Sequence, residues 1–146
     1  APENMEVLIG WTGSPASSPH LVSEVKRLKS DPIFYGEFLD QSNTCVENLI
    51  YAFKTNNIKG VQKMIRQNRS IIQQMDKEAT VDIETKKLKL LCDIGERFGG
   101  AAKTSGAGGG DCGITIIDNK VDKPSIYEVW EKEGIKPLKF KIYHGQ

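Results

Sequence analysis

Glycine is distributed very unevenly along this 146-residue chain. Half of its fourteen glycines fall within the fifteen residues from 99 to 113. Glycine allows backbone conformations with positive φ and lets the main chain approach a ligand closely. A tight hairpin turn needs only one or two glycines, whereas five stand within residues 106–113. The density favours a ligand-binding loop over a plain turn, and consecutive amides of such a loop form a concavity that attracts an anion.

The segments on both sides of this loop have the residue types of β-strands. Residues 101–104 precede the loop and residues 112–117 follow it, so it joins two neighbouring strands. Elsewhere, apolar residues recur at helical spacing, and proline or small polar residues mark the helix starts. The remaining expected elements are strands at 6–10 and 138–143 and helices at 19–29, 32–55, 58–79, 84–98 and 124–133.

This order of elements predicts an α+β fold. The expected order is β-α-α-α-α-β-β-α-β, with the strands gathered into an antiparallel sheet and the helices packed on one face, as in a ferredoxin-like domain with extra helices. A chain of 146 residues with 38% apolar side chains is long enough to bury one core. We therefore expect residues 1–146 to form a single domain.

Composition excludes several classes of partner. Lys and Arg outnumber Asp and Glu by only 20 to 19 and form no block of like charge, which argues against nucleic-acid binding. The longest apolar runs, 49–53 and 114–117, are far shorter than the ~20 residues of a membrane-spanning helix. Acidic Glu3 and Glu6 and the lack of a long apolar stretch argue against a signal peptide. These features predict a cytoplasmic protein with no membrane partner.

The cysteines predict neither a disulfide framework nor a metal site. Cys45, Cys92 and Cys112 are odd in number and lack C-x-x-C spacing, and the two histidines lie far apart. We expect reduced thiols, with Cys45 and Cys92 in the apolar faces of their helices.

The glycine-rich loop also carries polar groups that suit a ligand. Lys103 adds a positive charge, and Thr104 and Ser105 add hydroxyl donors. Residues 108–113 match the pattern G-x-G-x-x-G, but a dinucleotide-binding turn opens a helix and here a strand follows. The Walker pattern of P-loop nucleotidases is absent from the sequence.

A second candidate loop covers residues 11–18 and leads into the first expected helix. Backbone N–H groups at a helix start, beside the hydroxyls of Ser17 and Ser18, suit a phosphate or carboxylate, although Ser18 equally serves as a simple N-cap. Lys26 either folds back toward this site or is solvated. His20 either hydrogen-bonds an anion or only caps the helix.

Asn68 interrupts an apolar stripe. It lies in the middle of the apolar face of the helix expected at 58–79. Its amide either hydrogen-bonds a neighbouring backbone group in the core or contacts a ligand, and the sequence leaves both interpretations open.

The two candidate loops together resemble a known family. The segments GWTGSPASSPHLV, at 10–22, and KTSGAGGGDCG, at 103–113, are similar to the C-terminal part of bacterial phosphomevalonate kinases, which belong to the GHMP small-molecule kinases. The ending, with Trp130, Gly134 and Pro137, is similar as well, so the resemblance covers essentially the whole chain.

The resemblance implies a reaction and a set of binding residues. The glycine loop corresponds to the third motif of the family and lines the substrate pocket together with the loop at 11–18. The implied reaction transfers a phosphoryl group from ATP, with Mg²⁺, to 5-phosphomevalonate, and gives ADP and 5-diphosphomevalonate in the mevalonate pathway of isoprenoid biosynthesis. The implied substrate-binding residues are Ser17, Ser18, Lys26, Thr104, Ser105, Gly106, Ala107, Gly108, Gly109 and Asp111.

The chain departs from the family in what it lacks. The P-x-x-x-G-L-G-S-S-A loop that holds the ATP phosphates and the family's catalytic Asp and Lys are absent from the sequence. Because the chain begins at Ala1, we expect a fragment whose partner is the N-terminal, ATP- and Mg²⁺-binding domain of the same enzyme. Alone, such a fragment would hold no catalytic or metal-binding residue, would be inactive, and would expose an apolar face where the missing domain packed.

A different class of function is the alternative. The chain would then be a stand-alone anion-sensing or interaction domain on a ferredoxin-like scaffold, which binds a phosphate ligand without ATP. Asp111 as a general base in a self-sufficient enzyme has less support, because no second carboxylate or histidine lies near it in the sequence. A capping role for Asp111 in the loop is favoured.

Overall fold

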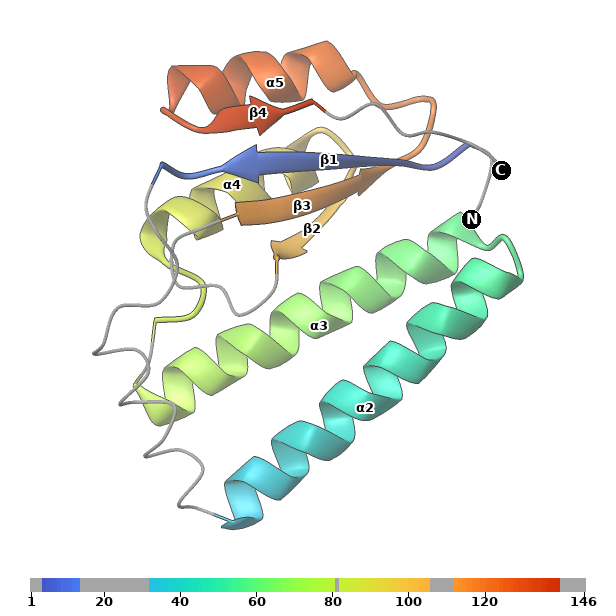
Figure 1. The fold of residues 1–146 in the computed structure, drawn as a ribbon, viewed down its shortest axis with the longest axis vertical. Coiled ribbons are helices and arrows are strands. Elements are labelled where there is room, and N and C mark those ends of the chain that lie inside the picture. Colours follow the sequence, from blue (N-terminus) through green and yellow to red (C-terminus); the bar gives the residue numbers. More distant parts are fainter. Residues whose placement is uncertain (1–3, 14–31, 81, 106–111, 140–146) are drawn as a thin grey trace.

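The fold is built around one antiparallel sheet with the strand order β2-β3-β1-β4 (Figure 1). The computed structural model describes residues 4–13, 32–80, 82–105 and 112–139. The elements in chain order are β1 (Glu6–Trp11), α2 (Pro32–Lys54), α3 (Ile58–Ala79), α4 (Lys86–Arg97), β2 (Ala101–Thr104), β3 (Cys112–Ile117), α5 (Lys123–Lys132) and β4 (Lys136–Leu138).

The α+β class and the antiparallel sheet expected from the sequence are confirmed. Strands β2 and β3 have the expected bounds, β1 extends one residue further than expected, and helices α2 to α5 begin and end within about two residues of the expected positions. The helix expected at 19–29 lies outside the described residues. Within the described ranges, no helix is both long enough and apolar enough to cross a membrane.

The last strand begins earlier than expected. The expected start at Leu138 is wrong, because β4 begins at Lys136 and places Pro137 opposite Gly10 of β1. Proline cannot donate a ladder hydrogen bond, but β4 is an edge strand of this sheet and an edge tolerates that loss. The rest of the expected strand, beyond residue 139, lies outside the described residues.

Capping side chains explain where three helices begin. The caps are Asn57 for α3, Thr85 for α4 and Asp122 for α5, and each accepts a hydrogen bond from a backbone N–H three residues further on. Helix α3 ends at Ala79, because the left-handed backbone of the next residue, Thr80 (φ 55°), cannot continue the helix.

Helices α4 and α5 cover one face of the sheet, which we call the closed face (Figure 1). Leu8 of β1 and Ile117 of β3 project into this core, where they meet Leu91 of α4 and Trp130 of α5. Burying side chains of this size stabilises the fold by about 1.5–3 kcal/mol each. The indole N–H of Trp130 donates to the Leu91 carbonyl at 3.1 Å, so the polar atom of this buried ring is satisfied.

Two glycines let α4 lie directly against the centre of the sheet. A Cβ atom at Gly113 would stand 2.5 Å from Leu91 Cδ2, and one at Gly10 would stand 2.9 Å from Leu91 Cδ1. Gly113 therefore has a packing role, separate from that of the other glycines in the glycine-rich segment.

The opposite face of the sheet, which we call the open face, is covered differently. Among the described residues, Val61 and Ile65 of α3 pack on Ala101 of β2 and Ile116 of β3. Helix α2 then packs on α3 as the second arm of a helical hairpin (Figure 1). Helix α3 thus covers the part of the open face that lies next to β2.

Candidate functional site

The glycine-rich segment connects β2 to β3 in a hairpin. The Ser105 N–H donates to the Cys112 carbonyl at 2.9 Å, which holds together the two ends of this segment. Strands β2 and β3 are antiparallel neighbours, with Thr104 opposite Gly113. The prediction that the loop joins two neighbouring strands is confirmed.

Most of the site residues predicted from the sequence lie outside the described residues, so their roles stay predictions. Thr104 and Ser105 are described, and Ser105 is half-buried at the mouth of the hairpin. The predicted residues outside the described ranges are Ser17, Ser18, Lys26, Gly106, Ala107, Gly108, Gly109 and Asp111, and His20 lies outside them as well.

The structure places the Thr104 side chain on the closed face. Ala102, two residues earlier on the same strand, belongs to the core with α4, and side chains two apart on a strand share a face. Thr104 is fully buried, and its Oγ1 has no hydrogen-bond partner among the described residues, as is also true of Thr115 Oγ1. The Thr104 hydroxyl therefore does not line the same surface as Lys103.

Lys103 projects toward the open face. It pairs with Ile114, whose side chain packs beside Val61 and Ile65 of α3. Lys103 is half-buried, and this burial lowers the pKa of its ammonium group. The charges that oppose this shift come from the thiols of Cys45 and Cys92, and no carboxylate in the described part of the chain forms an ion pair with Lys103.

Cys45 and Asn68 complete a polar cluster with Lys103 between α2, α3 and β2. The Cys45 thiol is 2% exposed and donates to the Met64 carbonyl at 3.2 Å. Burial raises the pKa of this thiol, while hydrogen bonds from Asn68 and the charge of Lys103 oppose that shift. We call Lys103, Asn68 and Cys45 the Lys103 cluster.

The Asn68 side chain lies near the Cys45 thiol, where it acts to lower the pKa that burial of the thiol raises. Its Oδ1 is buried and has no hydrogen-bond partner among the described residues. The ligand interpretation therefore stays open for this oxygen.

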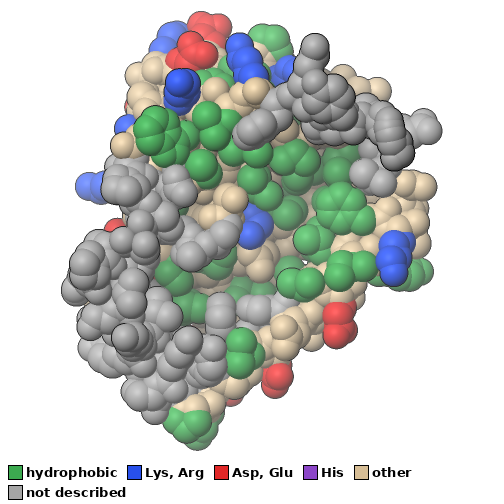
Figure 2. All heavy atoms as spheres, viewed as in Figure 1, with side chains coloured by type: hydrophobic (Ala, Val, Ile, Leu, Met, Phe, Trp, Pro, Cys, Tyr) green, Lys and Arg blue, Asp and Glu red, His purple; other side chains and the backbone are tan. Residues whose placement is uncertain are grey.

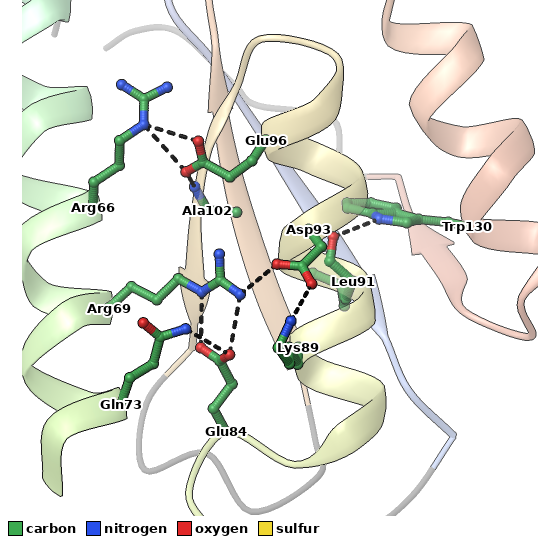
Figure 3. Close-up of polar contacts among 10 residues, drawn as sticks. All are labelled: Arg66, Arg69, Gln73, Glu84, Lys89, Leu91, Asp93, Glu96, Ala102 and Trp130. Atoms are coloured by element: carbon green, nitrogen blue, oxygen red, sulfur yellow. Dashed lines mark hydrogen bonds and ion pairs between the residues drawn. The ribbon is translucent and has the colours of Figure 1, made fainter. Parts of the chain in front are cut away.

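A charged network joins α3 to α4 (Figure 3). The Arg69 guanidinium donates to both carboxylate oxygens of Glu84, at 2.9 and 3.1 Å, and to Asp93 at 2.8 Å. The Glu84 side chain is only 3% exposed. Burial acts to lower the pKa of Arg69, but the two carboxylates raise it above its usual value. The network is structural, because every charge in it is paired.

A second set of bonds fixes the start of β2 (Figure 3). Arg66 Nε donates to Glu96 Oε1 at 2.9 Å, and Arg66 Nη2 donates to the Gly100 carbonyl at 3.1 Å. Glu96 Oε2 in turn accepts a bond from the Ala102 N–H at 3.2 Å. Side chains of α3 and α4 thus hold the strand that carries Lys103 and leads into the glycine loop.

The described residues do not provide a metal centre. They contain no group of three or more His, Cys, Asp or Glu side chains placed to hold a metal ion. Three of their carboxylates, those of Glu84, Asp93 and Glu96, are engaged with arginines.

The part of the open face beyond α3 is apolar and accessible. Val7 and Trp11 of β1 are each 38% exposed, and Ile9 and Ile114 beside them are half-buried. Figure 2 shows apolar side chains gathered over the middle of the molecule on the side seen in Figure 1. This surface agrees with the expectation of an exposed apolar face.

Part of the chain matches a known protein family. A family model described as "GHMP kinases C terminal" matches residues 49–136. Among curated proteins, the chain is 37% identical over 141 residues to a phosphomevalonate kinase from Streptomyces sp. strain CL190, covering 94% of this chain and 38% of that protein. A mevalonate kinase from Methanocaldococcus jannaschii is 34% identical over 74 residues, covering 51% of this chain and 22% of that protein. The chain therefore spans less than two fifths of the length of these relatives.

Solved structures share the fold. A Lin0012 protein from Listeria innocua has a TM-score of 0.85 and 39% identity, over 97% of this chain and 40% of that one. Phosphomevalonate kinase from Streptococcus pneumoniae, solved in complex with phosphomevalonate and AMPPNP, has a TM-score of 0.75 and 28% identity, over 92% of this chain and 38% of that one.

Proposed function

Because the chain belongs to the GHMP kinase family and matches the C-terminal domain of those kinases, we propose that it forms the substrate-binding part of a phosphomevalonate kinase. The reaction would transfer the γ-phosphoryl group of ATP to 5-phosphomevalonate and give ADP and 5-diphosphomevalonate. The observation that carries the proposal is 37% identity to a phosphomevalonate kinase over 94% of the chain. The β2–β3 hairpin, closed by Ser105 and Cys112, presents the glycine-rich segment as such a function requires.

In this proposal the chain's own residues bind and orient the substrate. Ser105, Gly106 and Ala107, with Gly108 and Gly109, approach the substrate phosphate or the phosphoryl group in transfer. Closely approaching amides and hydroxyls stabilise such charge without rearranging during the reaction. Thr104 supports the loop from the closed face, because its side chain is fully buried there.

The second loop would hold the substrate from the other side. We assign this role to Ser17 and Ser18, at the start of the expected first helix, and to Lys26 further along it. Asp111 would cap amides of the glycine loop and not act as a base. These assignments follow from the family resemblance of both segments.

ATP and Mg²⁺ would be bound mainly by another domain of the enzyme. The described residues offer no carboxylate cluster for Mg²⁺, and the carboxylates of Glu84, Asp93 and Glu96 in Figure 3 are already paired with arginines. The accessible apolar surface around Val7 and Trp11 would be the contact with that N-terminal domain. The chain alone would then be inactive, and cysteines that form no disulfide in the described part of the chain fit a cytoplasmic enzyme.

Kinetics of loop variants test the proposal in the complete gene product that contains this sequence. Ser105→Ala and Gly108→Val are expected to lower kcat/KM for 5-phosphomevalonate by about tenfold to a hundredfold, because each removes a donor or blocks close approach of the backbone. Ser70→Ala, at an exposed position of α3, is the matched control and should retain normal kinetics. Normal kinetics in both loop variants would refute the assignment. Phosphate binding without any ATP-dependent activity would instead support an anion-sensing domain.

A further inference from the structure

We propose that one side of helix α2 docks the N-terminal domain of the same enzyme, in addition to the sheet surface around Val7 and Trp11. The docking surface is a row of three exposed apolar side chains, Leu39, Val46 and Ile50, which we call the α2 stripe. The inference rests on the proposed function, in which this chain is one domain of a longer kinase, and it adds a second contact between the two domains.

Helix α2 carries most of the exposed apolar side chains. In the described part of the chain, seven large apolar side chains are exposed, and five of them belong to α2. Single exposed apolar side chains are common on protein surfaces and need no partner. The members of the α2 stripe differ because they are spaced by seven and four residues, so they share one side of the helix. The stripe extends over about 16 Å of the helix axis.

The α2 stripe carries no charge between its two ends. Between Leu39 and Val46, the same side of the helix carries the uncharged Asn43. The acidic residues Asp40 and Glu47 each follow a stripe residue by one position, which turns them about 100° round the helix. An uncharged, apolar side of a helix fits an apolar protein surface and not a charged ligand.

The α2 stripe continues the accessible apolar surface of the sheet. Phe53 lies seven residues after Val46 and three after Ile50, so it shares their side of α2, and it packs against the core between α3 and the open face. Ile114, beside the accessible sheet surface, packs against that same core. Figure 2 shows apolar side chains over both the sheet and the helical hairpin on this side of the molecule. One partner can therefore cover the stripe and the sheet together.

The length of the relatives favours the N-terminal domain as this partner. The chain spans 38% of the Streptomyces phosphomevalonate kinase and 40% of the Lin0012 protein, so each relative has more chain outside the matched region than within it. That additional chain is long enough to form a further domain. A second copy of this chain would have to reach the stripe past the domain that we place on the adjoining sheet surface. We therefore assign the α2 stripe to that domain.

Cysteine labelling in the complete gene product that contains this sequence tests the contact. Val46→Cys and Ile50→Cys place a thiol in the α2 stripe, and Tyr51→Cys places one on a different side of α2. The three positions are 48%, 48% and 70% exposed, so on an undocked helix their rates of maleimide labelling should agree within about twofold. With the stripe docked, we expect labelling at positions 46 and 50 to be at least about tenfold slower than at position 51.

Two controls accompany the labelling. The wild-type protein, in which Cys45 and Cys92 are buried and Cys112 is half-buried, gives the background rate. Each rate is measured over about a hundredfold range of protein concentration, because a contact within one chain does not depend on concentration, whereas a contact with a second copy weakens on dilution.

A charged substitution tests the same contact by opening it. Val46→Asp, added to the Ile50→Cys protein, should speed labelling at position 50 toward the rate at position 51, because burying an unpaired carboxylate opposes docking. Tyr51→Asp is the matched control, which adds the same charge outside the stripe and should leave labelling at position 50 slow. In the 146-residue chain by itself the stripe is exposed, so shortening one of its side chains should change the stability of that chain little.

Equal labelling at the three positions would overturn the contact, as would an unchanged rate at position 50 after Val46→Asp. Protection that disappears on dilution would overturn it as well and would assign the stripe to a second copy. The labelling needs neither substrate nor ATP, so it is separate from the activity. If positions 46 and 50 are protected but the protein releases no ADP with ATP, Mg²⁺ and 5-phosphomevalonate, the contact stands and the proposed function fails. If ADP is released and both positions are labelled freely, the proposed function stands and the contact fails.

Discussion

Leu91 and Lys103 lie on opposite faces of the same sheet, and their surroundings differ in kind. Leu91 is fully buried among Gly10, Gly113 and Trp130 on the closed face. Lys103 is a half-buried charge without an ion pair in the described residues, on a face where Trp11 stays 38% exposed. The closed face is covered by α4 and α5, whereas the open face keeps a half-buried charge and exposed apolar side chains. Function is expected where a fold leaves such groups unsatisfied.

The closed face is not free of unsatisfied groups, but these are of a milder kind. The hydroxyls of Thr104 and Thr115 are buried there without partners among the described residues. A neutral hydroxyl costs far less to bury than an ammonium group. The contrast between the faces is therefore one of charge and exposure.

Truncation of Leu91 should have the largest effect on stability. Leu91→Ala is expected to lower the free energy of unfolding by about 4 kcal/mol, because the tightly packed site between two central strands cannot collapse around the cavity. Chemical denaturation measures this loss. Val46→Ala, at a 48% exposed position of α2, is the control and should change stability by less than about 0.5 kcal/mol. Equal effects of the two substitutions would remove the basis for calling the closed face the core.

Loss of Arg69 should have the next largest effect, because Arg69 joins the helices that flank the two faces. Arg69→Met leaves the Glu84 carboxylate, which is 3% exposed, without its partner. The substitution is expected to lower the free energy of unfolding by about 3 kcal/mol. Arg66→Met is the matched comparison. The Arg66–Glu96 pair is 46% and 27% exposed, so its loss should cost about 1 kcal/mol or less. Urea denaturation measures the free energy of unfolding of both variants. A loss in Arg66→Met as large as that in Arg69→Met would contradict the ranking of these ion pairs by burial.

The smallest expected effect is the pH dependence carried by Asp93. Partial burial acts to raise the pKa of Asp93, but hydrogen bonds from Lys89 and Arg69 hold it below its usual value. A carboxylate with a lowered folded-state pKa contributes stability above its unfolded pKa of about 4, and this contribution is lost as pH falls through the folded-state pKa.

Asp93→Asn should therefore be less stable than the wild type near neutral pH, with a difference that shrinks below about pH 4. Thermal unfolding at a series of pH values measures this difference, and the other titrating groups cancel in the comparison. A difference that stays constant from about pH 6 to about pH 3 would show that Asp93 does not titrate as the geometry requires.

Local patterns predicted the hairpin that carries the candidate site. The glycine density and the β-prone flanks gave the bounds of β2 and β3 and placed Ser105 at the mouth of the loop. Strand alternation also implies that Lys103 and Thr104 face opposite sides. Which of those sides α4 covers depends on how the chain crosses over the sheet, so the burial of Thr104 could not be predicted.

The interactions that hold the site in place were not predictable from local patterns. Arg69 lies 15 residues from Glu84 and 24 from Asp93, and each resembles an ordinary solvated charge in the sequence. The Asp76 carboxylate, which accepts from the Ile83 N–H at 2.7 Å, also depends on a chain reversal after α3. Asn68 could be singled out from its apolar surroundings, but its contact with Cys45 depends on how α2 and α3 pack.

We propose that this chain binds 5-phosphomevalonate for phosphoryl transfer from ATP. Coupled detection of ADP release, with ATP, Mg²⁺ and the complete gene product that contains this sequence, tests it most directly. We expect ADP release with 5-phosphomevalonate and formation of 5-diphosphomevalonate, and little release when mevalonate is supplied in its place. No ADP release with 5-phosphomevalonate, or equal release with mevalonate, would contradict the proposed function.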